Sequence, residues 1–178
     1  LLVSCAGTVN KKNASAEKLA LTLLPTTPYI PVRERDKEGF LLPFSAQPNP
    51  YLLLKGKIKT ESVEEFIVAR RALKSKNFEQ AEAALNKIVK NDKKLAGPWV
   101  MKGDLAVQQS KLDDAIKYFE QAIRINKSNV NAYIRLAKTL RIQGKYVMAQ
   151  NVYAKALAVW RDFPEAHLNL AILYDVYI

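Results

Sequence analysis

Three cations stand three residues apart in the second half of the chain, at Arg135, Lys138 and Arg141. Residues three apart lie on the same side of an α-helix, so these side chains form one positively charged stripe. A guanidinium group binds a carboxylate through two parallel hydrogen bonds. No acidic residue occurs between positions 130 and 142. The spacing therefore predicts that this charge is available to a protein or peptide partner with an acidic or C-terminal segment.

Candidates for catalysis are few. His167 is the single histidine, and we expect it to pack, because it recurs at the repeat offset of Trp99 and Tyr133. Asp113 and Asp114 are adjacent, so their carboxylates do not share a helix face, and in a first turn they interact with the helix dipole. The motifs HExxH, CxxC and GxSxG and a phosphate-binding glycine loop do not occur. We therefore expect no enzyme activity, no metal and no cofactor within these residues.

Residues 1–5 resemble the end of a bacterial lipoprotein signal peptide, with Leu2 and Ser4 before the single cysteine, Cys5. In that family the cysteine is lipidated after cleavage. Ala6 in the next position implies, by the same resemblance, a protein anchored by lipid on the periplasmic face of the outer membrane. The alternative is a soluble, cytoplasmic protein in which Cys5 is a small apolar residue.

The chain carries a formal net charge of +11, from 28 basic and 17 acidic residues. This balance is typical of proteins that bind nucleic acid, an anionic membrane surface or acidic proteins. Nucleic-acid binding needs aromatic side chains interleaved with the basic ones on an exposed face. Phe119, Tyr133 and Tyr153 stand instead at apolar helix positions. We therefore expect a protein partner rather than nucleic acid.

Residues 6–60 differ in kind from the rest of the chain. Six of the eight prolines fall in this segment, which excludes a long helix or a central strand. A serine before an apolar run favours one short helix over residues 15–24. The segment is too aromatic for a free linker, so we expect an arm that lies along the remainder of the protein. Its expected anchors are Tyr29, Phe40, Phe44 and Tyr51.

A period of 34 residues organises residues 61–178. Small side chains recur where two antiparallel helices must approach closely, and aromatic ones recur beside them to fill the gaps. The residues Trp99, Gly103, Ala106, Ala115, Phe119 and Ala122 recur as Tyr133, Ala137, Leu140, Ala149, Tyr153 and Ala156. His167, Ala171 and Tyr174 continue the pattern at the first three offsets.

The helical period predicts seven helices separated by short polar turns. The turns within the pairs contain SKN, QSK and QGK, whose Gly144 can adopt a positive φ at a helix end. The predicted helices span residues 61–75, 79–91, 98–110, 113–125, 131–143, 147–160 and 165–177.

This pattern resembles that of the tetratricopeptide repeat family. The repeats would be residues 62–95, 96–129 and 130–163, followed by a truncated unit at 164–178. The resemblance implies an all-α, right-handed α-solenoid that acts as a protein-protein interaction scaffold. With Cys5, it is similar to bacterial tetratricopeptide lipoproteins that assist assembly of envelope complexes. Two alternatives remain, a soluble adaptor and the substrate-binding part of a larger enzyme.

The resemblance also implies a peptide groove on the concave face, lined by the first helix of each pair. The subclass that binds chaperone tails needs Lys and Asn in the first unit and Asn in the second. This chain has Phe66, Arg70 and Met101 there and matches only at Arg135, so that ligand is not expected. The predicted groove residues are Arg70, Lys74, Met101, Asp104, Gln108, Asn131, Arg135, Lys138, Arg141 and Asn169.

Overall fold

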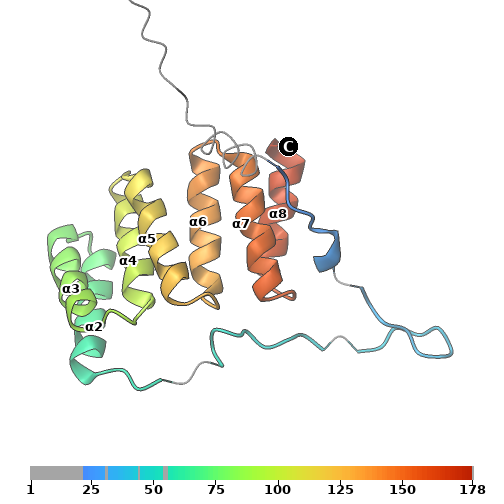
Figure 1. Ribbon diagram of the computed structural model, residues 1–178, viewed down its shortest axis with the longest axis horizontal. Helices are drawn as coiled ribbons and strands as arrows, with labels where there is room; N and C mark the ends of the chain where they lie inside the picture. Colours follow the sequence, from blue (N-terminus) through green and yellow to red (C-terminus); the bar gives the residue numbers. More distant parts are fainter. Residues whose placement is uncertain (1–21, 31, 44, 54–55, 178) are drawn as a thin grey trace, which may run out of the picture.

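The computed structural model describes residues 22–30, 32–43, 45–53 and 56–177. Over these ranges the chain forms an all-α helical repeat solenoid with an extended arm (Figure 1). All seven predicted helices are present, with bounds within two residues of those expected. The elements are η1 (Thr27–Tyr29), α2 (Thr60–Lys74), α3 (Phe78–Asn91), α4 (Gly97–Gln108), α5 (Leu112–Ile125), α6 (Val130–Ile142), α7 (Tyr146–Val159) and α8 (Pro164–Tyr177).

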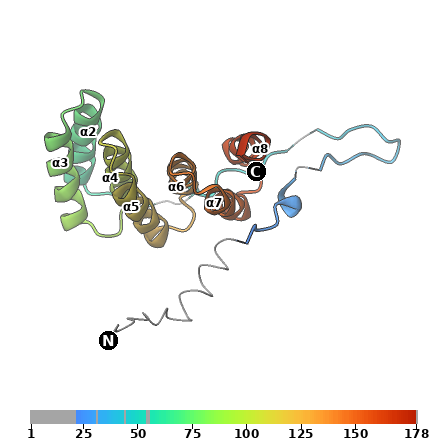
Figure 2. The same cartoon turned by 90° about the horizontal axis from the view of Figure 1, so that it is seen from above.

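The helices stack as pairs. α2 packs on α3, α4 on α5 and α6 on α7, and α8 packs on α7. The first helices also contact one another, α2 with α4 and α4 with α6. Figure 2 shows the first helices along one side and the second helices along the other, with the stack bent so that the first helices lie on the inner side. The expected concave face is therefore the one formed by α2, α4, α6 and α8.

The core lies at the predicted repeat offsets. Gly103 is buried in α4, and Phe119 and Tyr153 are almost completely buried at equivalent positions of α5 and α7. Alanines fill the close approaches between paired helices, as at Ala69 and Ala81 in the first pair. Burial of these small and aromatic side chains provides the hydrophobic stabilisation that holds each pair together.

The turns within the three pairs share one backbone geometry. Lys76, Ser110 and Gly144 stand 34 residues apart and have φ angles of 58°, 60° and 73°. Left-handed residues of this kind end a helix and redirect the chain. The prediction of a positive φ at Gly144 is confirmed, and the two other turns use the same conformation without glycine.

The fourth unit departs from the predicted core pattern. Ala171 is exposed and Tyr174 is 40% exposed, while His167 is half-buried with its Nε2 2.7 Å from the Arg161 carbonyl oxygen. In the other units these offsets face the second helix of the pair. The part of the chain that the structure describes pairs no second helix with α8, so the expected packing is wrong for Ala171 and Tyr174, whereas His167 is half-buried like Trp99 at the equivalent position.

The arm passes the far end of the solenoid twice before it reaches α2 (Figures 1 and 2). Tyr29 packs against the main core. Phe40 is 72% exposed in a loop that projects from the solenoid, so it is not an anchor. Residues 22–24 are not helical, and their main chain is bound by α7 side chains instead. Residues 15–21, Phe44 and Cys5 lie outside the described residues.

Candidate functional site

Four of the ten predicted groove residues meet around one hollow on the first-helix side. Met101 and Asp104 come from α4, and Asn131 and Arg135 come from α6. The hollow has a volume of about 190 Å³. Its remaining lining residues are Tyr51, Phe66, Gly97, Val100 and Asn129.

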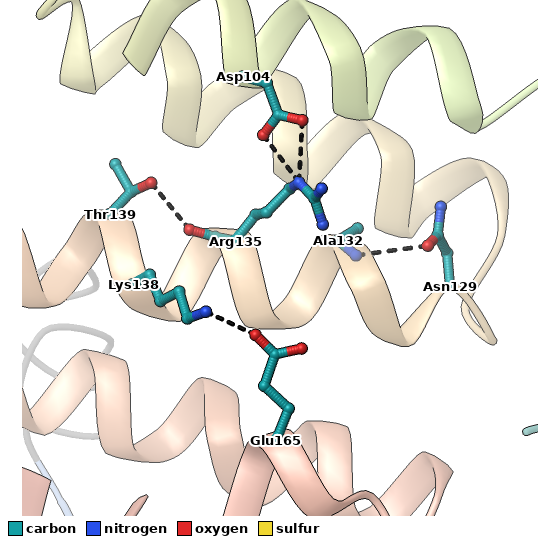
Figure 3. Close-up of polar contacts among 7 residues, drawn as sticks. All are labelled: Asp104, Asn129, Ala132, Arg135, Lys138, Thr139 and Glu165. Atoms are coloured by element: carbon teal, nitrogen blue, oxygen red, sulfur yellow. Dashed lines mark hydrogen bonds and ion pairs between the residues drawn. The ribbon is translucent and has the colours of Figure 1, made fainter. Parts of the chain in front are cut away.

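An ion pair between neighbouring first helices borders this hollow (Figure 3). The Arg135 Nε donates to both carboxylate oxygens of Asp104, at 2.7 and 3.0 Å. The Asp104 side chain is 31% exposed and that of Arg135 is 40% exposed. Burial raises the pKa of Asp104 above its ordinary value, although the Arg135 charge and hydrogen bond oppose that shift.

A second ion pair joins α6 to α8. The Lys138 Nζ lies 2.5 Å from Glu165 Oε1 (Figure 3). The expectation that no acidic residue pairs with the α6 stripe is therefore wrong for Arg135 and Lys138, although Asp104 engages Arg135 only through its Nε. Their acidic partners come from the helices on either side of α6, 31 residues before and 27 residues after in sequence.

The other predicted residues do not line the hollow. Arg70, Lys74 and Gln108 are exposed on α2 and α4, and Arg141 is half-buried at the end of α6. Asn169 is buried, and its Nδ2 donates to the Glu165 carbonyl oxygen at 2.7 Å. Within the described ranges, Arg70, Lys74 and Arg141 form no ion pair.

Two aromatic residues of the hollow were not among the predicted groove residues. Phe66 lies on α2, one position after the slot where the repeat pattern has Trp or Tyr. Tyr51 comes from the arm, where we expected an anchor but could not place its contact. The position of Phe66 in the repeat is a signal that sequence analysis could have used for the groove.

The described residues contain neither a cluster of metal-binding side chains nor a membrane-spanning helix. No group of three or more His, Cys, Asp or Glu side chains there could hold a metal ion. No helix in the same ranges is long and apolar enough to cross a membrane.

Residues 103–140 match the family model described as TPR repeat. With the recurring turns, the buried offsets and the stacked pairs, this match defines the helical part of the chain as a tetratricopeptide-repeat solenoid. Among curated proteins, the chain is 29% identical over 104 residues to human protein O-mannosyl-transferase TMTC1, and 31% identical over 98 residues to the mouse protein. These matches cover 56% and 55% of this chain and 12% and 10% of those proteins.

Solved structures with this fold include several peptide complexes. The Arabidopsis OM64 TPR domain has a TM-score of 0.59 at 19% identity, covering 65% of this chain and 95% of that one. The TPR2B domain of yeast Sti1 in its Hsp70 complex has a TM-score of 0.59 at 17% identity, covering 66% of this chain and 95% of that one. The second TPR domain of human RPAP3, with the HSP70 peptide SGPTIEEVD, has a TM-score of 0.58 at 18% identity, covering 64% of this chain and 95% of that one. At these identities the similarity shows the fold.

Proposed function

We propose that this protein is a protein-interaction scaffold whose hollow between α2, α4 and α6 binds an acidic peptide segment. The observation that carries the proposal is the orientation of Arg135. Asp104 engages only its Nε, and within the described part of the chain the two Nη atoms donate no hydrogen bond. A guanidinium fixed in this way can bind a ligand carboxylate without first being ordered.

The surroundings of Arg135 suit such a ligand. Met101 and Phe66 supply an apolar wall, and Met side chains adapt to ligands of different shape. Outside the hollow, Arg70 and Lys74 add positive charge on the exposed side of α2. A peptide with an acidic residue and an apolar neighbour would meet complementary groups on both counts.

The similar structures support this class of ligand. Yeast Sti1 TPR2B was solved as an Hsp70 complex, and human RPAP3 with the acidic peptide SGPTIEEVD. The chaperone-tail pattern itself is incomplete here, because Phe66, Arg70 and Met101 stand at its key places. We therefore propose the acidic class and not that particular sequence.

The test is fluorescence anisotropy with three labelled octapeptides, an acidic one with a free C-terminus, its amidated form and a basic one. We expect the acidic peptides to bind more tightly than the basic one, and Arg135→Gln to weaken that binding about tenfold or more, since charge-assisted hydrogen bonds contribute about 1.5–3 kcal/mol. Arg124→Gln, an equal charge change at an exposed position of α5, is the control. Equal binding by the parent and Arg135→Gln proteins would refute the site.

We further propose that Cys5 is lipidated and anchors the scaffold on the periplasmic face of the outer membrane. The support is the resemblance of residues 1–5 to a lipoprotein signal peptide. Cys5→Ser, expressed with the full signal sequence, should leave the membrane fraction and lose the lipid mass, because several acyl chains together anchor stably. Membrane association unchanged in Cys5→Ser would favour the soluble adaptor.

The curated relatives favour one other candidate function. Because they are named as O-mannosyl-transferases, these repeats could equally serve as the substrate-binding part of a larger enzyme. The full-length reading frame separates the two functions, since the enzyme requires a catalytic domain outside these 178 residues.

A further inference from the structure

Two buried amide side chains on α7, Gln150 and Asn151, bind the main chain of the arm. The Leu24 N–H donates to Asn151 Oδ1 at 2.7 Å, and Asn151 Nδ2 donates to the Thr22 carbonyl oxygen at 2.8 Å. Gln150 Nε2 donates to the Leu24 carbonyl oxygen, also at 2.8 Å. Residues two apart on an extended chain, such as Thr22 and Leu24, face the same side. Asn151 therefore binds the main chain of an extended segment.

At two positions of this surface the preceding repeat unit has apolar side chains in place of polar ones. The residues 34 positions before Gln150 and Tyr174 are Ile116 and Leu140, both of which pack in the hydrophobic core. Gln150 is 0% exposed and also donates to the Tyr174 hydroxyl at 3.1 Å. A buried amide is costly unless it is hydrogen-bonded. The Leu24 carbonyl oxygen and the Tyr174 hydroxyl both accept from Gln150 Nε2, whereas Gln150 Oε1 has no hydrogen-bond partner among the described residues.

The same arm segment is held at a second point. Five residues after Leu24, Tyr29 packs against the core. The segment therefore presents two features, an extended main chain at Gln150 and Asn151 and an aromatic side chain further along. These features define a ligand by conformation more than by sequence.

We propose that the surface formed by Gln150, Asn151 and Tyr174 is a second peptide-binding site, separate from the hollow, for extended segments followed by an aromatic residue. Arm residues 22–29 occupy it as a tethered, displaceable ligand. Neutral hydrogen bonds each contribute little net binding free energy, and a flexible tether provides an effective concentration on the order of millimolar. A partner segment with the same features can therefore replace the arm.

The test uses a labelled free peptide with the sequence of residues 22–30, TLLPTTPYI, and the full chain. In the chain, Leu24→Pro removes the N–H that donates to Asn151 Oδ1 and leaves the side chains of Gln150, Asn151 and Tyr174 unchanged. We expect the peptide to bind this variant about tenfold more tightly than the parent, whose own arm competes. Equal binding to both proteins, or to neither, would overturn the proposal.

Two controls separate recognition from misfolding. Adding Asn151→Ala to the Leu24→Pro chain should abolish binding, and adding Asn91→Ala, at an exposed position of α3, should not. A peptide N-methylated at the position of Leu24 should fail to bind the Leu24→Pro single variant. If the methylated peptide still binds, recognition through the backbone is refuted. Sedimentation of the parent should show a monomer. A dimer that Leu24→Pro abolishes would show that the arm of one copy binds this surface of a second copy. That result would overturn the proposal that each arm binds its own chain.

Discussion

Gly103 of α4 lies so close to the ring of Phe119 that a Cβ built on the glycine would be 2.6 Å from both Cδ1 and Cζ of that ring. Phe119 is 1% exposed, so its ring has no free space to move into. The first and second helices of the central repeat can approach this closely only without a side chain at position 103.

Gly103→Ala should therefore lower the free energy of unfolding by about 1–3 kcal/mol, despite the better helix propensity of alanine. Chemical denaturation of both proteins measures the difference. The matched control is Gly97→Ala at the start of the same helix, where a Cβ would meet Phe66 at an ordinary 3.7 Å. That variant should be as stable as the parent or more so. Equal effects of the two substitutions would contradict the close approach.

At the three equivalent turns, introducing a glycine should raise the stability of the protein and removing one should lower it. Ser110 adopts a φ of 60° that costs a non-glycine residue about 1–2 kcal/mol, so Ser110→Gly should raise thermal stability. Gly144, with a φ of 73°, should lose a similar amount when replaced by Ala. No Cβ contact lies within 4 Å of Gly144, so a loss there reports the backbone alone. Melting curves of both variants test the pair.

Asp104 should titrate above the ordinary aspartate range, because burial raises its pKa. An acid whose pKa is raised on folding binds its proton more tightly in the native state. Its contribution to stability is therefore present below the unfolded-state pKa and is lost as the pH rises through the folded-state pKa. Relative to Asp104→Asn, the parent should lose stability as the pH rises from about 4, where an unfolded aspartate ionises. NMR titration should show a further rise of the Asp104 pKa in Arg135→Ala.

Tyr153 offers an independent test at alkaline pH. Burial raises its pKa to about 12, and its hydroxyl has no hydrogen-bond partner among the described residues. Tyr153→Phe should therefore raise the free energy of unfolding at pH 7 by about 1 kcal/mol. The parent should also lose stability relative to this variant as the pH rises from about 10, where an unfolded tyrosine ionises, to about 12. Parallel pH profiles would argue against a buried, unpaired hydroxyl.

The repeat pattern was predictable from sequence because its signal is local. Small residues at Ala69 and Ala81 and aromatic ones at Phe119 and Tyr153 recur at fixed intervals, and their burial follows from helix periodicity alone. The core prediction for the fourth unit was wrong for the same reason. The pattern places Tyr174 in a core that needs a partner helix, and periodicity within one helix cannot show whether that partner is there.

The charge pairing at the hollow could not be read from one helix. Arg135 has no acidic neighbour in its own helix, yet Asp104 meets it from the preceding repeat. Comparing the inward-facing places of neighbouring first helices would have helped, since Asp104 and Arg135 both fall on such places. The arm contacts leave a different signal, the change from Ile116 to Gln150 at equivalent positions.

The attachment of the arm at the α7–α8 turn sets a mechanical limit on the whole stack. Gln47 is held through both main-chain groups, its N–H by Asp162 at 2.7 Å and its carbonyl by the Trp160 indole at 2.8 Å. Thirteen residues later the chain enters α2 at Thr60, so at about 3.5 Å per residue these points can be at most about 45 Å apart. In a solenoid each repeat contacts only its neighbours, so without the arm the curvature of the stack could change more freely. A ligand that moves Gln47 and Thr60 further apart than this limit must therefore first release Gln47 from Asp162 and Trp160.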